Sequence, residues 1–413
     1  MLARSATCSR LRRNPAMDPR YTLVGCSFVI QGVVIGSMFA YGVFLPFLEA
    51  EFGWSRALLS STLSTASLVM GVFAIGGGHL VDRYGPRWVL SVTGVICGLG
   101  YVLTGTLSAP WQLFVYFGLM VGIGMSTHDV GTLPVVARIF DKRRGAMTGV
   151  VKVGTAVGQI IIPYTATVLI AGLGWRCAAI ALGCGGAVLL LLAAQGLNPS
   201  RIRRPGGPEH AGAAPRSGYS LRQVLSRRTF WTLCVTQFTF MPALITIPLH
   251  LPVHGTDLGM TVTAAAALLS VIGATSVAGR LVIGRIADWL GGRRALSLCL
   301  VLLSTSLALV PALTSATALY GFAVLYGFAH GGLFTVISPT VAEYFGMRAH
   351  GAIFGAIVFC GTLGAAAGPM AAGWIFDVEG SYALAFWGLA GLSAVAFALI
   401  ATLPAGESER KIS

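Results

Sequence analysis

Two cations of this sequence, Arg280 and Lys152, lie inside long apolar runs, where a charge needs a chemical reason. A charged side chain near the centre of a bilayer is costly, so the few that occur there usually serve a function. A guanidinium binds a carboxylate through two parallel hydrogen bonds, and an ammonium acts beside it as a point charge. We therefore expect Arg280 and Lys152 to bind a substrate that carries a carboxylate.

Three further titratable residues, Asp129, His128 and His330, lie in apolar runs and are candidates for carrying protons. Asp129 could balance the two cations at rest until a substrate carboxylate replaces it; a permanent ion pair with Lys152 is the alternative. His330 could relay a proton or donate a hydrogen bond to the substrate, because histidine titrates near neutral pH. A neutral, hydrogen-bonded lining residue is the alternative for His330. Adjacent residues on a helix point to different faces, so we expect Asp129 rather than His128 to face the substrate.

Aromatic side chains in the same runs could wall a small substrate, with plain packing as the alternative for each. These are Tyr41, Phe39, Phe334 and Phe354. The sequence shows no cluster of metal ligands, no nucleophile paired with a base and no phosphate-binding loop. Its eight cysteines include no C-x-x-C pair and are explained as small packing residues. We predict that the chain is not an enzyme and uses no metal or cofactor.

The elements that position these residues follow from the composition, which is 55% hydrophobic and only 10% charged over 413 residues. A soluble domain of this size has about 25% charged residues. Apolar windows of about 20 residues recur along the chain, which is the signal of transmembrane helices. The sequence thus predicts an all-α membrane protein with twelve transmembrane helices in two six-helix halves. The predicted spans are Tyr21–Leu48, Ala57–Leu80, Trp88–Leu107, Trp111–Ile139, Ala146–Ala171, Trp175–Leu197, Thr229–Val253, Val262–Trp289, Ala295–Leu313, Thr317–Val341, Gly351–Phe376 and Tyr382–Leu403.

Positive charge is concentrated on one side of these spans, with 28 Lys and Arg against 14 Asp and Glu in the chain. Apart from Lys152 and Arg280 in the interior of spans, only Arg56 and Arg176 do not lie on that side. Cytoplasmic loops of membrane proteins carry such an excess, so both termini are predicted to be cytoplasmic and the basic surface to contact membrane lipid. We do not expect nucleic acid as a partner, because the Arg clusters lack interleaved aromatic residues.

Breaks in composition divide the chain into five segments. A Pro-, Gly- and Arg-rich stretch between the halves predicts a cytoplasmic linker, with a short amphipathic helix near Tyr219–Arg228. The basic N-terminal residues precede an apolar run too long for a signal peptide, so they predict a cytoplasmic tail, with Met17 as an alternative start. The segments are an N-terminal tail (1–20), a first half (21–197), a linker (198–228), a second half (229–403) and a C-terminal tail (404–413).

A motif at the end of the second span recurs 206 residues later, which indicates two parallel repeats. An Asp at this helix end could bind the N-terminus of another helix or an Arg of the other half, and the glycines allow a tight turn. We expect the motif to close the cytoplasmic side when the outside is open. The alternative is that its Arg residues only set topology. The motif is Gly78-x-x-x-Asp82-Arg83-x-Gly85-x-Arg87, its repeat is Gly284-x-x-x-Asp288-x-x-Gly291-x-Arg293, and Gly145-Ala146-x-x-Gly149 recurs as Gly351-Ala352-x-x-Gly355.

These motifs resemble those of the major facilitator superfamily, whose loop between the second and third helices is similar to Gly78–Arg87. The resemblance covers 21–403 and implies that the fourth, fifth, eighth and tenth helices border a central cavity. It also implies that Arg280 is the substrate-binding cation. Three further motifs look like the branch of monocarboxylate transporters and oxalate:formate antiporters: Tyr41-Gly42-Val43-Phe44, Phe52-Gly53-Trp54-Ser55 and Arg143-Arg144-Gly145-Ala146.

Two positions depart from this branch. Proton-coupled animal members carry an Asp one turn before the Arg, where this chain has Ser276. The oxalate antiporter carries a Lys in its eleventh helix, where this chain has apolar and small residues around Ile357. The resemblance makes the fifth and eighth helices neighbours, and at 1.5 Å per residue Lys152 and Arg280 each lie about 12 Å from the cytoplasmic end. Lys152 could therefore supply the second cation.

We therefore predict a secondary active transporter of small organic anions, such as lactate or pyruvate, that works by alternating access as a monomer in a bacterial inner membrane. Proton symport is the leading mode. Exchange of carboxylates or dicarboxylates is the first alternative, favoured if Lys152 and Arg280 act together. A cationic drug/proton antiporter using Asp129 is disfavoured by two buried cations against one anion. A non-transporting sensor is disfavoured because the linker is too short for a folded output domain.

Overall fold

The computed structural model describes residues 18–140, 142–197 and 218–405, and these residues are almost entirely helical. Among them, eleven helical stretches are long and apolar enough to cross a membrane. One of these, α7, has 53 residues and is broken at Gly174, whose φ of 76° and ψ of 160° are not helical, so it supplies two spans. The twelve predicted spans are confirmed.

The elements of the first half are α1 (Pro19–Phe52), α2 (Arg56–Tyr84), α3 (Pro86–Thr104), α4 (Pro110–Leu113), η1 (Phe114–Val121), α5 (Gly122–Met125), α6 (His128–Ile139) and α7 (Arg144–Gly196). The later elements are α8 (Leu221–Leu225), α9 (Arg228–Asp257), α10 (Val262–Leu290), α11 (Gly292–Leu309), η3 (Val310–Ala312), α12 (Ala316–Phe345), α13 (His350–Glu379) and α14 (Ala383–Ala401).

The helices α2 and α10 begin and end in the same way, which confirms the internal repeat at the level of structure. The side-chain oxygens of Ser55 and Thr261 each accept a hydrogen bond of 3.3 Å from the backbone three residues on, which caps the two N-termini. Both helices end at a glycine with φ of +86°, Gly85 and Gly291. Only glycine adopts this conformation without a steric penalty, so these two glycines fix the turns that follow.

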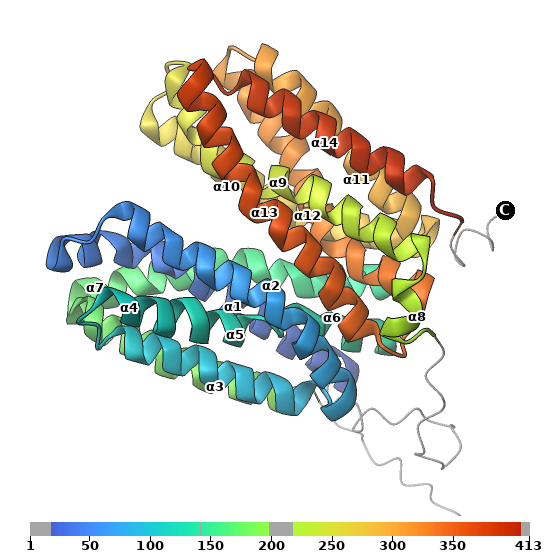
Figure 1. Cartoon of the computed structure of the whole chain (residues 1–413), viewed down its shortest axis with the longest axis horizontal. Coiled ribbons are helices and arrows are strands. Elements are labelled where there is room, and N and C mark those ends of the chain that lie inside the picture. The colour runs from blue at the N-terminus through green and yellow to red at the C-terminus, as the bar shows by residue number, and fades with distance from the viewer. Residues whose placement is uncertain (1–17, 141, 198–217, 406–413) are drawn as a thin grey trace, which may run out of the picture.

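The two halves lie side by side along a shared boundary. Figure 1 shows α1 to α7, in blue to green, as one group and α9 to α14, in yellow to red, as another. Across the boundary α2 packs against α13, and α7 packs against α10. The repeat exchanges these two pairs, so a pseudo-twofold axis passes between them.

The fourth span departs from the single helix that the sequence predicted. It consists of α4, the π-helix η1, α5 and α6, with a turn at Ser126 and Thr127. Its counterpart in the second half, α12, is one regular helix. Stretches of π-helix are rare and often mark functional sites, and here the irregularity lies directly before His128 and Asp129.

The short helix predicted near Tyr219–Arg228 is present as α8. Ser220 and Gln223 form a reciprocal cap at its N-terminus, with bonds of 2.9 and 3.4 Å. Val224 is fully buried, and the backbone N–H of Tyr219 donates to the carbonyl of Phe345 at 3.0 Å. Most of the predicted linker and tails (1–17, 198–217 and 406–413) lies outside the described residues.

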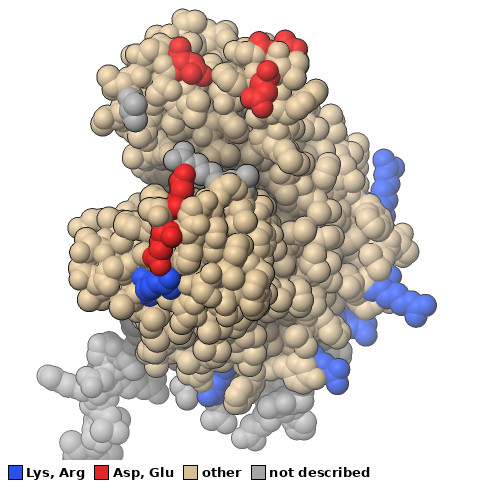
Figure 2. All heavy atoms as spheres, turned by 60° about the vertical axis from the view of Figure 1, so that its left-hand side comes forward, with Lys and Arg blue, Asp and Glu red and all other residues tan. Residues whose placement is uncertain are grey.

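The two ends of the described part of the chain differ in charge. Figure 2 shows Asp and Glu side chains at one end and most Lys and Arg side chains at the other. The surface is notched between the two halves at the acidic end. Arg176, one of the two basic residues expected there, pairs with Glu51 at 2.6 Å.

Candidate functional site

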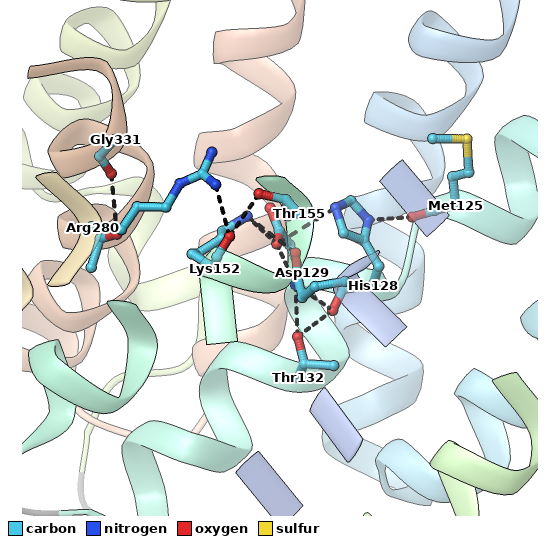
Figure 3. Close-up of polar contacts among 10 residues, drawn as sticks. Met125, His128, Asp129, Thr132, Lys152, Thr155, Arg280 and Gly331 are labelled. Atoms are coloured by element: carbon cyan, nitrogen blue, oxygen red, sulfur yellow. Dashed lines mark hydrogen bonds and ion pairs between the residues drawn. The ribbon is translucent and has the colours of Figure 1, made fainter. Parts of the chain in front are cut away.

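Asp129, in the first turn of α6, is the centre of a polar cluster between the helices (Figure 3). Its Oδ1 accepts hydrogen bonds from Lys152 Nζ of α7 at 2.5 Å and from Gln31 Nε2 of α1 at 2.8 Å. The side chain of Lys152 is 5% exposed and that of Asp129 is 17% exposed. The ion pair with Lys152 that the sequence left open as an alternative is therefore present, and it is buried.

Gln31 joins the three helices of this cluster. It is fully buried, and Nε2 also lies 2.9 Å from Thr132 Oγ1, while Oε1 lies 3.5 Å from Lys152 Nζ. The sequence interpretation missed Gln31 because it considered only ionisable groups. The available signal was a single amide within the apolar run Val29–Val34, since a buried amide needs partners.

His128 lies beside Asp129, although adjacent residues on a helix point to different faces; that Asp129 rather than His128 faces the substrate stays a prediction. His128 Nε2 lies 3.5 Å from Asp129 Oδ1, and Nδ1 lies 2.6 Å from the carbonyl oxygen of Met125. The reason is the turn before α6, which brings the Met125 carbonyl beside the imidazole and holds the ring over the first turn. Both residues thus belong to one cluster.

Arg280, in α10, reaches across the boundary between the halves. It is 3% exposed, and Nη1 donates to the backbone carbonyl of Lys152 at 3.0 Å. This contact and the packing of α7 against α10 confirm that the fifth and eighth spans are neighbours, and the common depth of the two cations in the membrane stays a prediction. In the described part of the chain Nε of Arg280 is buried without a hydrogen-bond partner, and the guanidinium has no carboxylate partner.

His330, in α12, lies one helix away from Arg280. Its Nδ1 is 3.3 Å from the hydroxyl of Ser276, which precedes Arg280 by one turn in α10. The ring packs edge-on against Phe334 at 5.0 Å between centroids. Phe334 in turn lies below Lys152, with Nζ 5.8 Å from the ring centroid. His330 and Phe334 therefore connect the second half to the Asp129 cluster.

Among the described residues, no hydrogen bond, ring contact or cation–π contact joins the other three candidate aromatics to the charged cluster. Tyr41 is buried and donates to the carbonyl of Leu59 at 2.9 Å. Phe354 stacks on His350, with centroids 6.0 Å apart, and Phe39 is 52% exposed. The structure thus brings one of the four aromatics, Phe334, to the cluster.

The repeated motif places two carboxylates against helix N-termini of the opposite half. Asp288 of α10 accepts hydrogen bonds from the backbone N–H groups of Gly145 (2.6 Å) and Ala146 (2.9 Å) at the start of α7. Asp82 of α2 accepts one from Ala352 N–H (3.2 Å) at the start of α13. The first N–H groups of a helix lack partners within it and create a positive potential, so a carboxylate is stabilised there. These contacts join the halves at the basic end.

Where α7 crosses α10 and α2 crosses α13, the two backbones approach each other at glycines. A Cβ added to Gly145 would lie 2.0 Å from the carbonyl oxygen of Gly284, and one added to Gly78 would lie 2.2 Å from that of Gly351. Real Cβ atoms do not approach this closely, so a side chain at either position would force the helices apart. The glycines of the motif thus permit the approach that the carboxylates stabilise.

Three other residues of the motif contact neighbours in their own half. Arg83 is exposed over the ring of the next residue. Arg87 donates to Gln195 at 2.6 Å, and Arg293 donates to the carbonyl of Leu403 at 2.9 Å. These contacts lie within one half, and the role of the Arg residues in topology or in closing the cytoplasmic side stays a prediction.

Arg138, which the sequence interpretation missed, completes the surroundings of Asp82. Its Nη2 lies 2.8 Å from Asp82 Oδ1 and comes from α6 of the same half. Glu343, 205 residues later, instead accepts a hydrogen bond of 2.8 Å from the N–H of Gly292 at the start of α11. Arg138 and Glu343 occupy equivalent positions of the two repeats but carry opposite charges, so the sequence did not reveal that both bind at a helix end: Arg138 pairs with Asp82, and Glu343 binds the N-terminus of α11.

Within the described residues, no group of three His, Cys, Asp or Glu side chains could hold a metal ion.

Comparison with known proteins supports a transporter. A family model described as Major Facilitator Superfamily matches residues 27–316 and 290–413. The chain is 27% identical over 376 residues to monocarboxylate transporter 13 of Rattus norvegicus, covering 89% of this chain and 84% of that protein. It is 26% identical to monocarboxylate transporter 11 of Homo sapiens, covering 89% and 79%.

Two solved structures share the fold. The human organic anion transporter MFSD10 superimposes with a TM-score of 0.70 at 18% identity, covering 92% of this chain and 99% of that chain. The transporter FucP in its outward conformation gives a TM-score of 0.72 at 16% identity, covering 93% and 98%. The relatives and structures named here are transporters, not enzymes.

Proposed function

This chain belongs to the major facilitator superfamily, and we propose that it carries a small monocarboxylate together with a proton across a bacterial inner membrane. It is a multi-pass membrane transporter whose relatives include monocarboxylate transporters. The proposal adds the substrate class, the coupling ion, the membrane and a monomeric state with cytoplasmic termini. Its basis is the position of Arg280 at the boundary between the halves.

The single observation that carries the proposal is the unpaired guanidinium of Arg280. A buried charge is stable only when it is paired, and Arg280 has no carboxylate partner among the described residues. Its Nε remains free for a second hydrogen bond, and Lys152 lies beside it. A substrate carboxylate would complete both the charge and the hydrogen bonding of this group.

The direction of access in this conformation follows from the two carboxylate contacts. Asp82 and Asp288 hold the halves together at the basic end, and the surface is notched between the halves at the acidic end. If the basic end is cytoplasmic, as its charge predicts, the substrate enters from the outside in this state. Separation of the two contacts would then open the site to the cytoplasm.

Exchange of carboxylates remains the second candidate, because Lys152 and Arg280 lie side by side. Two adjacent cations could bind both ends of a short dicarboxylate. A cationic drug/proton antiporter is disfavoured, since Asp129, its only candidate cation site among the buried groups described above, is already paired with Lys152.

The test is uptake of labelled lactate, pyruvate, oxalate and malonate into liposomes that contain the purified protein, with and without an inward proton gradient. Gradient-stimulated uptake of a monocarboxylate supports the proposal. Uptake that requires preloaded carboxylate and ignores the gradient supports exchange instead. Failure to move any of these anions would overturn the assignment to organic anions.

A further inference from the structure

We propose that the coupling proton binds at the His128–Asp129 pair, and that its arrival transfers Lys152 from Asp129 to the carboxylate of the substrate. This inference rests on the proposed function and specifies how proton and anion are coupled. It differs from a proton site beside the substrate-binding Arg, because it lies in α6, in the opposite half of the molecule.

The hydrogen bonds of His128 define where the proton binds. A backbone carbonyl can only accept, so the contact of 2.6 Å with Met125 requires a proton on Nδ1. In a neutral imidazole Nε2 then carries a lone pair, and this lone pair faces Asp129 Oδ1 at 3.5 Å. Two acceptors that face each other repel, and one additional proton on the pair removes that repulsion.

The two oxygens of Asp129 have different roles. Oδ1 accepts from Lys152 and Gln31, whereas Oδ2 accepts no hydrogen bond from any described residue. The side chain of Asp129 is 17% exposed, whereas that of Lys152 is only 5% exposed. Oδ2 is therefore the oxygen that is free to receive an incoming proton, and a proton there lowers the negative charge that the lone pair of His128 Nε2 faces at Oδ1.

The charges around the pair explain why proton and substrate favour each other. Lys152 faces it from α7, and Arg280 lies beyond, from α10; α1 contributes only the neutral Gln31. With Asp129 ionised, these groups carry a net charge of about +1, and protonation raises it to about +2. A monocarboxylate restores the first value, so each ligand lowers the cost of binding the other, and the coupling is reciprocal.

Lys152 is the group that moves. When Asp129 is protonated, the buried ammonium loses its counter-charge, and Gln31 Oε1 at 3.5 Å is a weak replacement. The lysine side chain is a flexible stem with a compact charge, and Arg280 is bonded to the backbone of the same residue. After its release from Asp129, the ammonium of Lys152 can therefore move toward a carboxylate that is bound to Arg280.

The first experiment measures proton binding without substrate. Infrared difference spectra between acidic and alkaline buffer are recorded for the wild-type protein, for Asp129→Asn and for the control Asp257→Asn, whose carboxylate is exposed at the end of α9. We expect a carboxylic-acid carbonyl band in the wild type and in the control that is absent from Asp129→Asn. In a further variant, His128→Gln, the same band should be present at a shifted frequency. Persistence of that band in Asp129→Asn would overturn the proposal.

The second experiment separates coupling from transport. In liposomes, Asp129→Asn mimics the protonated carboxyl, so it should keep exchange of labelled for preloaded carboxylate but lose stimulation by the proton gradient. Retained stimulation would also overturn the proposal. If Asp129→Asn does not fold, His128→Gln decides by the same two readouts, since it removes the basic nitrogen of the pair and leaves the ion pair of Asp129 with Lys152. If the wild type moves no carboxylate, the proposed function fails while the infrared result still decides the proton site.

Discussion

Arg280 and Asp129 are charged groups of opposite sign in the site, and each is bonded to a different kind of partner. Asp129 is bonded to side chains of α1 and α7, whereas Arg280 is bonded to a backbone carbonyl. A carbonyl carries no net charge, so it orients the guanidinium without neutralising it. Arg280 thus remains available for an anion, and Asp129 does not remain available for a cation.

Replacement of Arg280 tests this difference at the level of a single residue. Arg280→Ala and Arg280→Lys should weaken binding of the transported carboxylate by about 10- to 100-fold, since a hydrogen bond to a charged group contributes about 1.5–3 kcal/mol. Arg285→Lys, at an exposed position of the same helix, is the matched control and should leave binding unchanged. Binding is measured by substrate-induced stabilisation of the purified protein; wild-type affinity in Arg280→Ala would contradict the assignment.

Gln31 offers a second test, because the repeat supplies its own control. Gln31→Leu removes donors to Asp129 and Thr132 and should lower the free energy of unfolding by about 1–3 kcal/mol. Gln237, 206 residues later in α9, is also buried, but its Oε1 has no partner in the described part of the chain. Gln237→Leu should therefore cost little or stabilise. Thermal unfolding in detergent compares the two, and equal losses would refute the role given to Gln31.

Charge made some of these residues predictable and left others hidden. Arg280, Lys152 and Asp129 stand out because an ionisable group in an apolar run is rare. Gln31 is neutral and gives no such signal. The mutual orientation of His128 and Asp129 depends on the turn at Ser126 and Thr127, which no local pattern indicated.

At the scale of helices, the glycine crossings decide how closely the halves meet. Gly145→Ala would place a methyl group 2.0 Å from the carbonyl oxygen of Gly284, and overpacking of this kind costs about 1–3 kcal/mol. We expect the variant to favour the state that is open at the basic end. Gly388→Ala, where the new methyl group meets nothing within 4 Å, is the control.

This shift is measured by labelling a cysteine introduced near the crossing with a thiol reagent applied from the basic side. Faster labelling in Gly145→Ala than in Gly388→Ala is expected. Unchanged labelling would mean that the crossing does not control access.

Helix boundaries were predictable where the same boundary residues occur in both copies of the repeat. The paired caps Ser55 and Thr261 and the paired stops Gly85 and Gly291 define α2 and α10 by position and by residue type. The π-helix η1 was not predictable, since its residues form an apolar run like that of any other span, and no second copy in α12 shows the same departure.

At the scale of the whole molecule, the distribution of charge predicts the orientation in the membrane. Figure 2 shows acidic side chains at one end and most basic side chains at the other. Glu51 lies in the last turn of α1, and Arg348 lies in the loop between α12 and α13. In a cysteine-free background, a membrane-impermeant thiol reagent should label Glu51→Cys on intact cells and Arg348→Cys only after permeabilisation. The reverse pattern would show that the basic end faces outward.

The architecture as a whole was the most predictable level, because it depends on counts and spacings. Twelve apolar windows and one repeat at an offset of 206 residues suffice to define two six-helix halves. The pattern within one repeat does not show which helices meet across the boundary. The pairing of α7 with α10 was expected only from the family resemblance, and the pairing of α2 with α13 was not predicted.

The exchange of partners across the pseudo-twofold axis has a consequence for how the basic end opens. Loss of the Asp288 contact alone leaves the Asp82 contact as a hinge on the other side, and the halves can then only tilt sideways. A passage for the substrate opens only when both contacts break in the same conformational change. The transition should therefore be cooperative: the two end states are populated, and intermediates with one contact broken are rare.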